Sequence, residues 1–111
     1  MEQIKVKSEQ RTMLLKCRDA VKAVDSGAEV ILYGSRARGD AAPDSDYDLL
    51  VLTDGEASLD REDRFRQSIF PIELETGCVL TVMLVNSSDW KSPLYDSMPF
   101  YRNVKREGIL V

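Results

Sequence analysis

The 111-residue sequence predicts an α/β (α+β) fold, a single domain over residues 1–111 with a small mixed sheet flanked by helices. Three apolar runs have the length of strands, at residues 29–33, 48–52 and 79–85. Two longer stretches, 8–26 and 60–74, repeat apolar residues at helical spacing. We expect a sandwich in which all helices lie on one side of the small sheet.

The first helix is expected to end near Ser26, where Gly27 supplies a stop signal. Its apolar residues recur at steps of three and four: Met13, Leu14, Cys17, Val21 and Val24. The strand at 29–33 follows and ends at Gly34. A glycine-rich turn and a short helix are expected over 35–41, and Pro43 then favours an extended chain that enters the strand at 48–52.

The second half of the chain begins with a turn at Asp54-Gly55. In the charged helix over 60–74, Pro71 predicts a kink or a break, and Gly77 ends the stretch. Its buried stripe is expected to contain Phe65, Ile69, Ile72 and Leu74, and its charged face to be solvated: Arg61, Glu62, Asp63, Arg64 and Arg66.

The strand at 79–85 is nearly all apolar, which predicts a central position or cover on both faces. Residues 87–90 can form a short turn or helix, and residues 91–98 are expected to be loop. A last short helix over 99–107 would bury Phe100, Tyr101 and Val104 and stop at Gly108.

Two acids at the start of the second strand form a pattern that suits the binding of a metal ion. Asp46 and Asp48 are two residues apart, so the alternation of a strand directs both carboxylates to one face. Two adjacent carboxylates repel each other, and Mg²⁺, which prefers oxygen ligands, would offset their charge. Gly34 and Ser35 form a turn whose backbone N–H groups can approach a phosphate closely. Phosphoryl or nucleotidyl transfer suits such a combination.

Composition excludes several classes of function. The sequence contains no histidine, so Ser-His and Cys-His catalysis and histidine-ligated zinc sites are excluded. Cys17 and Cys78 are expected to be buried, reduced thiols. The net charge of −4 argues against a polynucleotide as the main ligand. No apolar run approaches a membrane span and residues 1–7 lack a signal-peptide core, so we expect a cytoplasmic protein without membrane contact.

The spacing Gly34-Ser35, ten residues, Asp46-Tyr47-Asp48 resembles the signature of the polymerase-beta-like nucleotidyltransferase superfamily. The short chain is similar to minimal nucleotidyltransferases, the antitoxin-like partners of HEPN-domain proteins in toxin–antitoxin pairs. The resemblance implies a mixed sheet, Asp46 and Asp48 as catalytic Mg²⁺ ligands, and Gly34 and Ser35 as contacts of a nucleoside triphosphate such as ATP. It also suggests phosphate contacts for Arg36 and Arg38, although solvated side chains are an alternative for both.

The sequence departs from the family pattern in the third strand. Active members commonly carry a third carboxylate there, as a metal ligand or as a base. Matching the strand at 79–85 to the family places Thr81 at this position, and a threonine cannot act as a base. Glu73 and Glu75 are expected at the end of the preceding helix or in its turn, and either could replace the missing acid only if the helix ends earlier than predicted.

Three functions remain open from the sequence. The chain could transfer AMP from ATP to a hydroxyl of a HEPN-type partner protein, with that partner or a second copy of the chain completing the site. It could instead be a catalytically impaired module that binds nucleotide or partner and acts by occlusion. It could also modify a small molecule, as aminoglycoside nucleotidyltransferases do, but those enzymes usually need an additional helical domain.

Overall fold

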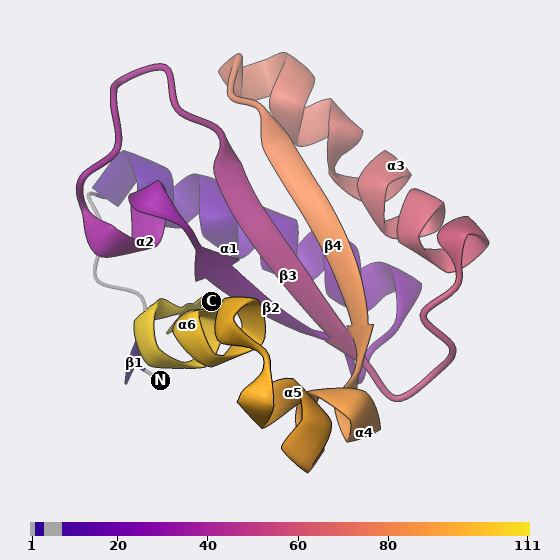
Figure 1. Ribbon diagram of the computed structural model, residues 1–111. Coiled ribbons are helices and arrows are strands. Elements are labelled where there is room, and N and C mark those ends of the chain that lie inside the picture. Colours follow the sequence, from indigo (N-terminus) through magenta and orange to yellow (C-terminus); the bar gives the residue numbers. More distant parts are fainter. Residues whose placement is uncertain (1, 4–7) are drawn as a thin grey trace.

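The computed structural model describes residues 2–3 and 8–111 of the chain (Figure 1). Its elements follow one another in this order: β1 Glu2–Gln3, α1 Ser8–Val24, β2 Glu29–Tyr33, α2 Ser35–Arg38, β3 Tyr47–Thr53, α3 Leu59–Thr76, β4 Leu80–Asn86, α4 Ser87–Trp90, α5 Pro93–Ser97, α6 Pro99–Glu107 and β5 Ile109–Leu110. In the described part of the chain, no helix combines the length and the apolar character needed to cross a bilayer.

The strands form one mixed sheet in the order β1-β5-β2-β3-β4, which confirms the predicted fold class. β3 runs antiparallel to β2 and parallel to β4, while β5 adds to the other side of β2. The strand β2 begins and ends at the predicted residues, and the short strands β1 and β5 were not predicted. Their two-residue length carries no periodic signal that a sequence could reveal.

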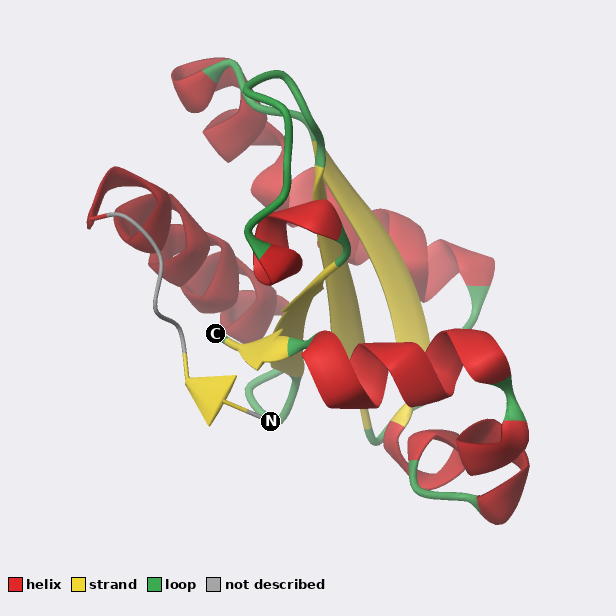
Figure 2. Ribbon diagram, turned by 60° about the vertical axis from the view of Figure 1, so that its left-hand side comes forward, coloured by secondary structure: helices red, strands yellow, loops and turns green. Residues whose placement is uncertain are grey.

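Helices cover both faces of the sheet, so the expectation of helices on one side was wrong (Figure 2). One face packs against α1 and α3 and forms the larger core, to which Leu14, Val21 and Phe65 contribute fully buried side chains. The other face packs against the short C-terminal helices through Trp90 of α4 and Val104 of α6. The segment 91–98, expected to be loop, contains α5, which begins at Pro93 with Ser92 as its N-cap.

The helix α3 continues through Pro71 without a break. Phe65, Ile69 and Ile72 on either side of the proline are buried against the sheet, and this packing keeps the helix continuous across Pro71. The predicted burial of Leu74 was wrong, because this side chain is 71% exposed. Gly77 ends the helix in a left-handed conformation, as predicted, and its N–H donates to the Glu73 carbonyl.

The strand β4 lies at the edge of the sheet, so the expectation of a central position was wrong. Two carboxylates from α3 occupy its outer side. Glu73 accepts a hydrogen bond from the backbone N–H of Leu80, and Glu62 accepts one from that of Leu84. The glutamates thus satisfy donors that an edge strand would otherwise expose to other chains.

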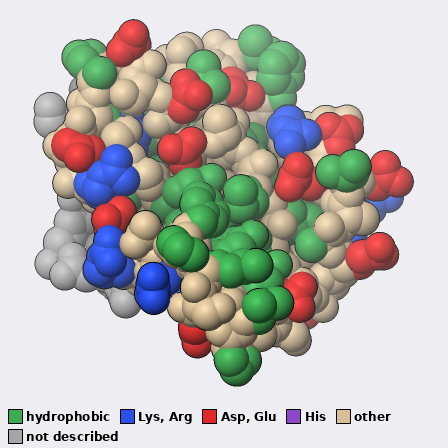
Figure 3. Space-filling model, in the orientation of Figure 1, with side chains coloured by type: hydrophobic (Ala, Val, Ile, Leu, Met, Phe, Trp, Pro, Cys, Tyr) green, Lys and Arg blue, Asp and Glu red, His purple; other side chains and the backbone are tan. Residues whose placement is uncertain are grey.

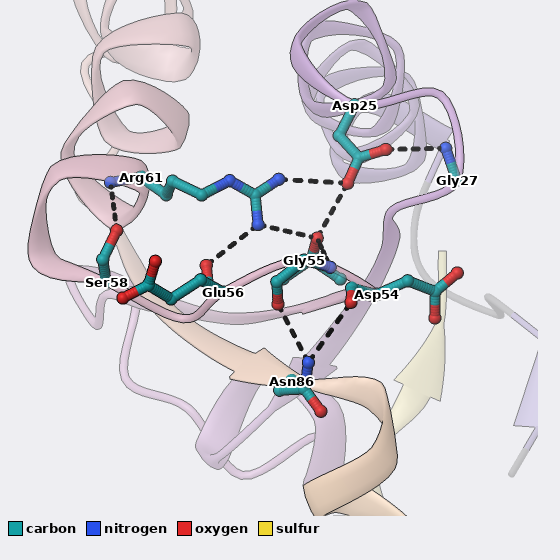
Figure 4. Close-up of polar contacts among 9 residues, drawn as sticks. Asp25, Gly27, Asp54, Gly55, Glu56, Ser58, Arg61 and Asn86 are labelled. Atoms are coloured by element: carbon teal, nitrogen blue, oxygen red, sulfur yellow. Dashed lines mark hydrogen bonds and ion pairs between the residues drawn. The ribbon is translucent and has the colours of Figure 1, made fainter.

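A polar cluster ties α1 and α3 to the ends of β3 and β4 (Figure 4). The buried Thr53 hydroxyl donates to Asp25 at 2.7 Å and accepts from Arg61 and from the N–H of Gly55. Arg61 also forms an ion pair with Asp25 at 3.2 Å. Arg61 is therefore half-buried in this cluster rather than part of the solvated face that we predicted.

The two cysteines have different environments, and both are free thiols. Cys17 is fully buried in the larger core, as predicted. Burial first, then the nearby Glu73 and Cys78, raises the pKa of Cys17 to about 12. Cys78 lies at the entrance to β4 and is only partly buried, so the expectation of a second buried thiol was wrong.

Candidate functional site

Gly34 brings the backbone at the end of β2 against a carboxylate of the neighbouring strand. Its φ of 76° and ψ of −158° lie in a region that only glycine adopts without strain. A Cβ atom at this position would lie 2.5 Å from Oδ2 of Asp48. The glycine is therefore required twice, by the conformation of the turn and by the closeness of Asp48.

Ser35 begins the four-residue helix α2, which is shorter than the predicted 35–41. The Gly34 carbonyl accepts from the N–H groups of Ala37 and Arg38, both at 3.1 Å. The N–H groups of Ser35 and Arg36 lie before the first of these bonds, and the carbonyls four residues before them belong to β2 rather than to the helix. This part of the turn can therefore donate backbone hydrogen bonds to an anion.

Asp48 lies inside β3 and Asp46 directly before it, in the exposed loop. Tyr47 between them is buried in the larger core, on the face opposite Asp48, as the alternation of the strand predicts. Asp46 lies one residue beyond the paired strand, and its position on the side of Asp48 stays a prediction. The pair thus combines a carboxylate fixed by the sheet with one that is carried by the preceding loop.

Thr81 of β4 lies beside Asp48, at the position that the sequence comparison with the family gave it. The two residues are register partners in the parallel pair of β3 and β4, and the Thr81 hydroxyl donates to Oδ1 of Asp48 at 2.9 Å. Within residues 2–3 and 8–111, no three or more acidic, cysteine or histidine side chains come together in a group that could hold a metal ion. The described site therefore contains the carboxylates of Asp46 and Asp48, and the hydroxyl of Thr81 occupies the position of the third carboxylate.

Glu73 and Glu75 lie in the last turns of α3, as predicted, and each has another partner. Glu73 accepts from the N–H of Leu80, and Glu75 pairs with Lys16 of α1. Both acids thus serve contacts of α3.

Arg36 holds the loop that carries Asp46, a role that sequence reasoning missed. Its guanidinium donates to the Ser45 carbonyl at 2.9 and 3.2 Å and to the Pro43 carbonyl at 3.0 Å. It also stacks over the ring of Tyr47, 4.4 Å from the ring centre. Arg36 therefore holds the backbone next to Asp46 and is not a freely solvated side chain, while its contact with phosphate stays a prediction. Backbone carbonyl partners leave no signal in a sequence.

Arg38 is exposed and pairs with Asp40 at 3.2 Å and with Glu107 of α6 at 3.4 Å. The hydrogen bond from Arg38 to Asp40, and then that to Glu107, raises the pKa of the guanidinium. The Glu107 carboxyl in turn has a lowered pKa, chiefly through its bond to Arg106 and also through Arg38. Arg38 thus joins the motif turn to the C-terminal helix.

A pocket opens between the motif turn and α6, and its volume is about 330 Å³. We call it the Gly34 pocket, and it is lined by Tyr33, Gly34, Arg38, Phe100, Asn103, Val104 and Glu107. Phe100 is 42% exposed here, so the prediction that α6 buries it was wrong. An amphipathic helix with an aromatic residue on its rim was the one sequence signal that could have indicated this pocket.

The donor set suits a hard divalent cation. Asp46 and Asp48 offer carboxylate oxygens, and the backbone of Gly34 approaches Asp48 closely enough to bring a phosphate and a metal ion together. Mg²⁺ keeps several waters and takes ligands from substrate phosphates, so two protein carboxylates are an adequate set. The residues present therefore fit a Mg²⁺ ion bound together with a phosphorylated ligand.

Comparisons with known proteins bear on the family and the fold of the chain. The family model described as a nucleotidyltransferase domain matches residues 14–110. A solved structure of the RNA terminal uridylyl transferase Cid1 has a TM-score of 0.54 and 18% identity over 93% of this chain and 38% of that one. A Sulfolobus solfataricus protein named as a nucleotidyltransferase has a TM-score of 0.49 and 19% identity, with 96% and 87% of the two chains covered.

The comparison with Cid1 shows the fold alone, and this chain spans well under half of the Cid1 chain. No curated protein matches the sequence. The family model, however, covers nearly the whole chain, including the Gly34-Ser35 turn and the pair of aspartates. The chain belongs to the nucleotidyltransferase domain family.

Proposed function

We propose that this domain binds Mg²⁺ and ATP and transfers AMP to a hydroxyl group of a partner protein. The observation that carries the proposal is the closeness of Gly34 to Asp48, because it brings the turn that we propose to bind phosphate next to the carboxylate that we propose to bind the metal ion. In this reaction the acceptor hydroxyl attacks the α-phosphorus and pyrophosphate leaves. Mg²⁺ on Asp46 and Asp48 would supply neutralisation of the charge on the phosphate oxygens.

The chain's own residues have distinct parts in this proposal. Backbone N–H groups of the Gly34-Ser35 turn hold the triphosphate, and Arg36 keeps the loop of Asp46 in position. Thr81 orients the Asp48 carboxylate by donating to its Oδ1 oxygen. A threonine cannot accept the proton of the attacking hydroxyl, so the acceptor protein or solvent takes that proton.

A partner protein is proposed as the acceptor for two reasons. The resemblance to minimal nucleotidyltransferases implies a HEPN-domain partner, in a cytoplasm that supplies ATP and Mg²⁺. The face that carries the site also exposes apolar side chains on α5 and after it, with Leu94 63% and Met98 38% exposed. Figure 3 shows hydrophobic side chains gathered in the middle of this face. A second copy of the chain is the alternative occupant.

The bond between Thr81 and Asp48 favours a second candidate function. A hydroxyl in place of the third carboxylate leaves nucleotide binding possible but removes the internal base. In this alternative the domain binds nucleotide and partner and neutralises the partner by occlusion. The two candidates share the binding site and differ in whether a bond to the α-phosphate is made.

Incubation with ATP labelled on the α-phosphate, Mg²⁺ and a candidate HEPN partner separates these functions. Transfer of label to the partner, lost in Asp46→Asn/Asp48→Asn and on chelation, is the expected result. The matched control is Asp44→Asn/Asp54→Asn, which removes two exposed acids outside the pair and should retain transfer. ATP binding without label on any protein would support the occluding module, and absence of ATP binding would contradict both candidates.

A further inference from the structure

The Gly34 pocket directly adjoins the proposed phosphate turn. Gly34 belongs both to its lining and to the contact with Asp48, so one residue marks the boundary between the pocket and the carboxylate site. The opposite wall is provided by α6, which contributes Phe100 and Asn103. The volume of about 330 Å³ falls at the lower end of the range for small-ligand sites, which is about 300–1,000 Å³.

The walls of the pocket suit an aromatic ring. Tyr33 and Phe100 pack edge to face, with ring centres 5.7 Å apart. Phe100 nevertheless remains 42% exposed, which is unusual for an aromatic residue that already has two ring neighbours in Tyr33 and Tyr101. An exposed aromatic wall offers a surface on which a nucleobase can stack.

Asn103 lies one helical turn from Phe100 on the same wall. Its side-chain amide can donate one hydrogen bond and accept another, which matches the edge of a nucleobase. Among residues 2–3 and 8–111, no side chain or backbone group hydrogen-bonds this amide. The pocket therefore contains an aromatic surface and an uncommitted donor–acceptor pair.

The charge of the pocket favours an uncharged group over a phosphate. Arg38 is the one cationic side chain in its lining, and it is already paired with Asp40 and Glu107. A phosphate placed here would meet the Glu107 carboxylate without an unpaired cation to offset it. The base and ribose of a nucleotide carry no charge and meet no such penalty.

We propose that the Gly34 pocket binds the nucleoside end of the nucleotide, with its base on Phe100 and Asn103, while the triphosphate extends past Gly34 to the aspartates. This inference rests on the proposed function, because it adds a nucleoside-binding part to the site that we propose for the triphosphate. It places Arg38 at the nucleoside end, as a wall residue whose pair with Glu107 keeps the pocket neutral.

Calorimetric titration with ATP and with inorganic tripolyphosphate, each with Mg²⁺, tests the assignment. Phe100→Ala should weaken ATP binding about 10-fold, since stacking on one aromatic side chain contributes about that factor. Asn103→Ala should weaken it about 5-fold. Tripolyphosphate, which lacks a nucleoside, should bind all variants as it binds the wild type.

Matched controls separate the pocket from general effects on the fold. Phe70→Ala removes an exposed aromatic side chain, and Gln67→Ala removes an exposed amide, both from α3 on the other face. Both should retain wild-type affinity for ATP. If Phe100→Ala and Asn103→Ala bind ATP as tightly as these controls, or lose tripolyphosphate to the same degree, the pocket assignment is wrong while the proposed function stands. If the wild type binds neither ligand, both fail.

Discussion

The backbone at Gly34 leaves no room for a side chain, and this can be tested against a glycine of similar conformation. Both Gly34 and Gly39 have positive φ angles, but a Cβ at Gly39 would meet nothing within 4 Å. Gly39→Ala should therefore lower the free energy of unfolding by about 1 kcal/mol through strain alone. Gly34→Ala should lower it by roughly 3 kcal/mol and displace Asp48. Chemical denaturation of both variants measures the difference.

Equal losses in the free energy of unfolding for the two alanine variants would show that Asp48 moves away from the added methyl group without a loss of stability. Binding of Mg²⁺ and ATP gives a second measurement on the same proteins. It should persist in Gly39→Ala and be lost in Gly34→Ala, since only the latter disturbs the carboxylate.

A substitution of Arg36 tests whether this side chain positions the loop that carries Asp46. Arg36→Lys keeps the positive charge but loses the planar donors that reach the Ser45 and Pro43 carbonyls together. We expect a loss of about 1–2 kcal/mol in the free energy of unfolding and a weaker affinity for Mg²⁺ and ATP. The control Arg18→Lys changes an exposed arginine on α1 and should alter neither quantity.

An effect of Arg36→Lys on stability without an effect on ligand affinity would contradict the positioning role. At this scale the predicted position of Thr81 opposite Asp48 is confirmed by the register of β3 and β4. The binding roles of Gly34 and Asp48 stay predictions. The sequence did not reveal that Arg36 holds the loop, because its partners are backbone carbonyls. It also did not reveal that Asn103 lines the pocket, because no complementary residue marks that position.

Among the elements, α3 protects the free edge of β4, and two substitutions test this. Glu62→Ala/Glu73→Ala removes the acceptors for the N–H groups of Leu84 and Leu80. Edge strands with unpaired donors associate with other chains, so this variant should form dimers or larger species. Glu62→Gln/Glu73→Gln retains a carbonyl acceptor at each position and should stay as monomeric as the wild type in light scattering. Identical behaviour of the two variants would contradict the protection.

The Asp25 cluster predicts how stability depends on pH. The Thr53 hydroxyl, the Gly27 N–H and Arg61 hold the pKa of Asp25 below its usual value of 3.8. Because the folded-state pKa is the lower one, the contribution of Asp25 is complete above that value and is lost as pH falls through the folded-state pKa. Asp25→Asn should lower the free energy of unfolding at pH 7 by about 1 kcal/mol.

The difference between wild type and Asp25→Asn should shrink as the pH falls below 3.8. Thermal unfolding between pH 2.5 and pH 7 measures this, and Asp19→Asn, at an exposed acid of α1, is the control. A difference that is constant over the range would mean that the charge of Asp25 has no part in the cluster.

Elements with long periodic patterns were predictable, and short ones were not. α1 and α6 were predicted with correct starts, since capping and spacing signals agree there. Pro71 gave a misleading signal because burial of its neighbours outweighs one missing hydrogen bond. The apolar run of β4 indicated a central strand, whereas glutamate side chains complete an edge strand of the same composition.

For the whole molecule, Cys17 reports on global opening. Burial raises its pKa to about 12, so its thiol is both inaccessible and protonated at pH 8. A thiol reagent should therefore modify Cys78 alone in the folded protein and both cysteines in denaturant. The Cys17→Ala variant should give one modified thiol under either condition. Rapid modification of Cys17 without denaturant would mean that α1 separates from the sheet far more often than a buried core permits.

The two faces of the sheet account for what could be predicted about the molecule. The face under α1 and α3 is formed by long helices whose apolar stripes are visible in the sequence. The other face is completed by three short helices, whose aromatic residues are spread over residues 90–104 without a continuous period. The site lies on this second face, so its phosphate half was predictable from the motif, and its pocket was not.

The single tryptophan gives this second face an intrinsic optical probe. Trp90 is 7% exposed, packs edge to face with Tyr101 of α6 at 6.3 Å, and has the Lys105 ammonium 4.9 Å from its ring centre. A displacement of α6 would change the field and the quenching at the indole ring. Emission from an unlabelled sample can therefore follow the helix that walls the Gly34 pocket in real time, without a fluorophore attached to protein or ligand.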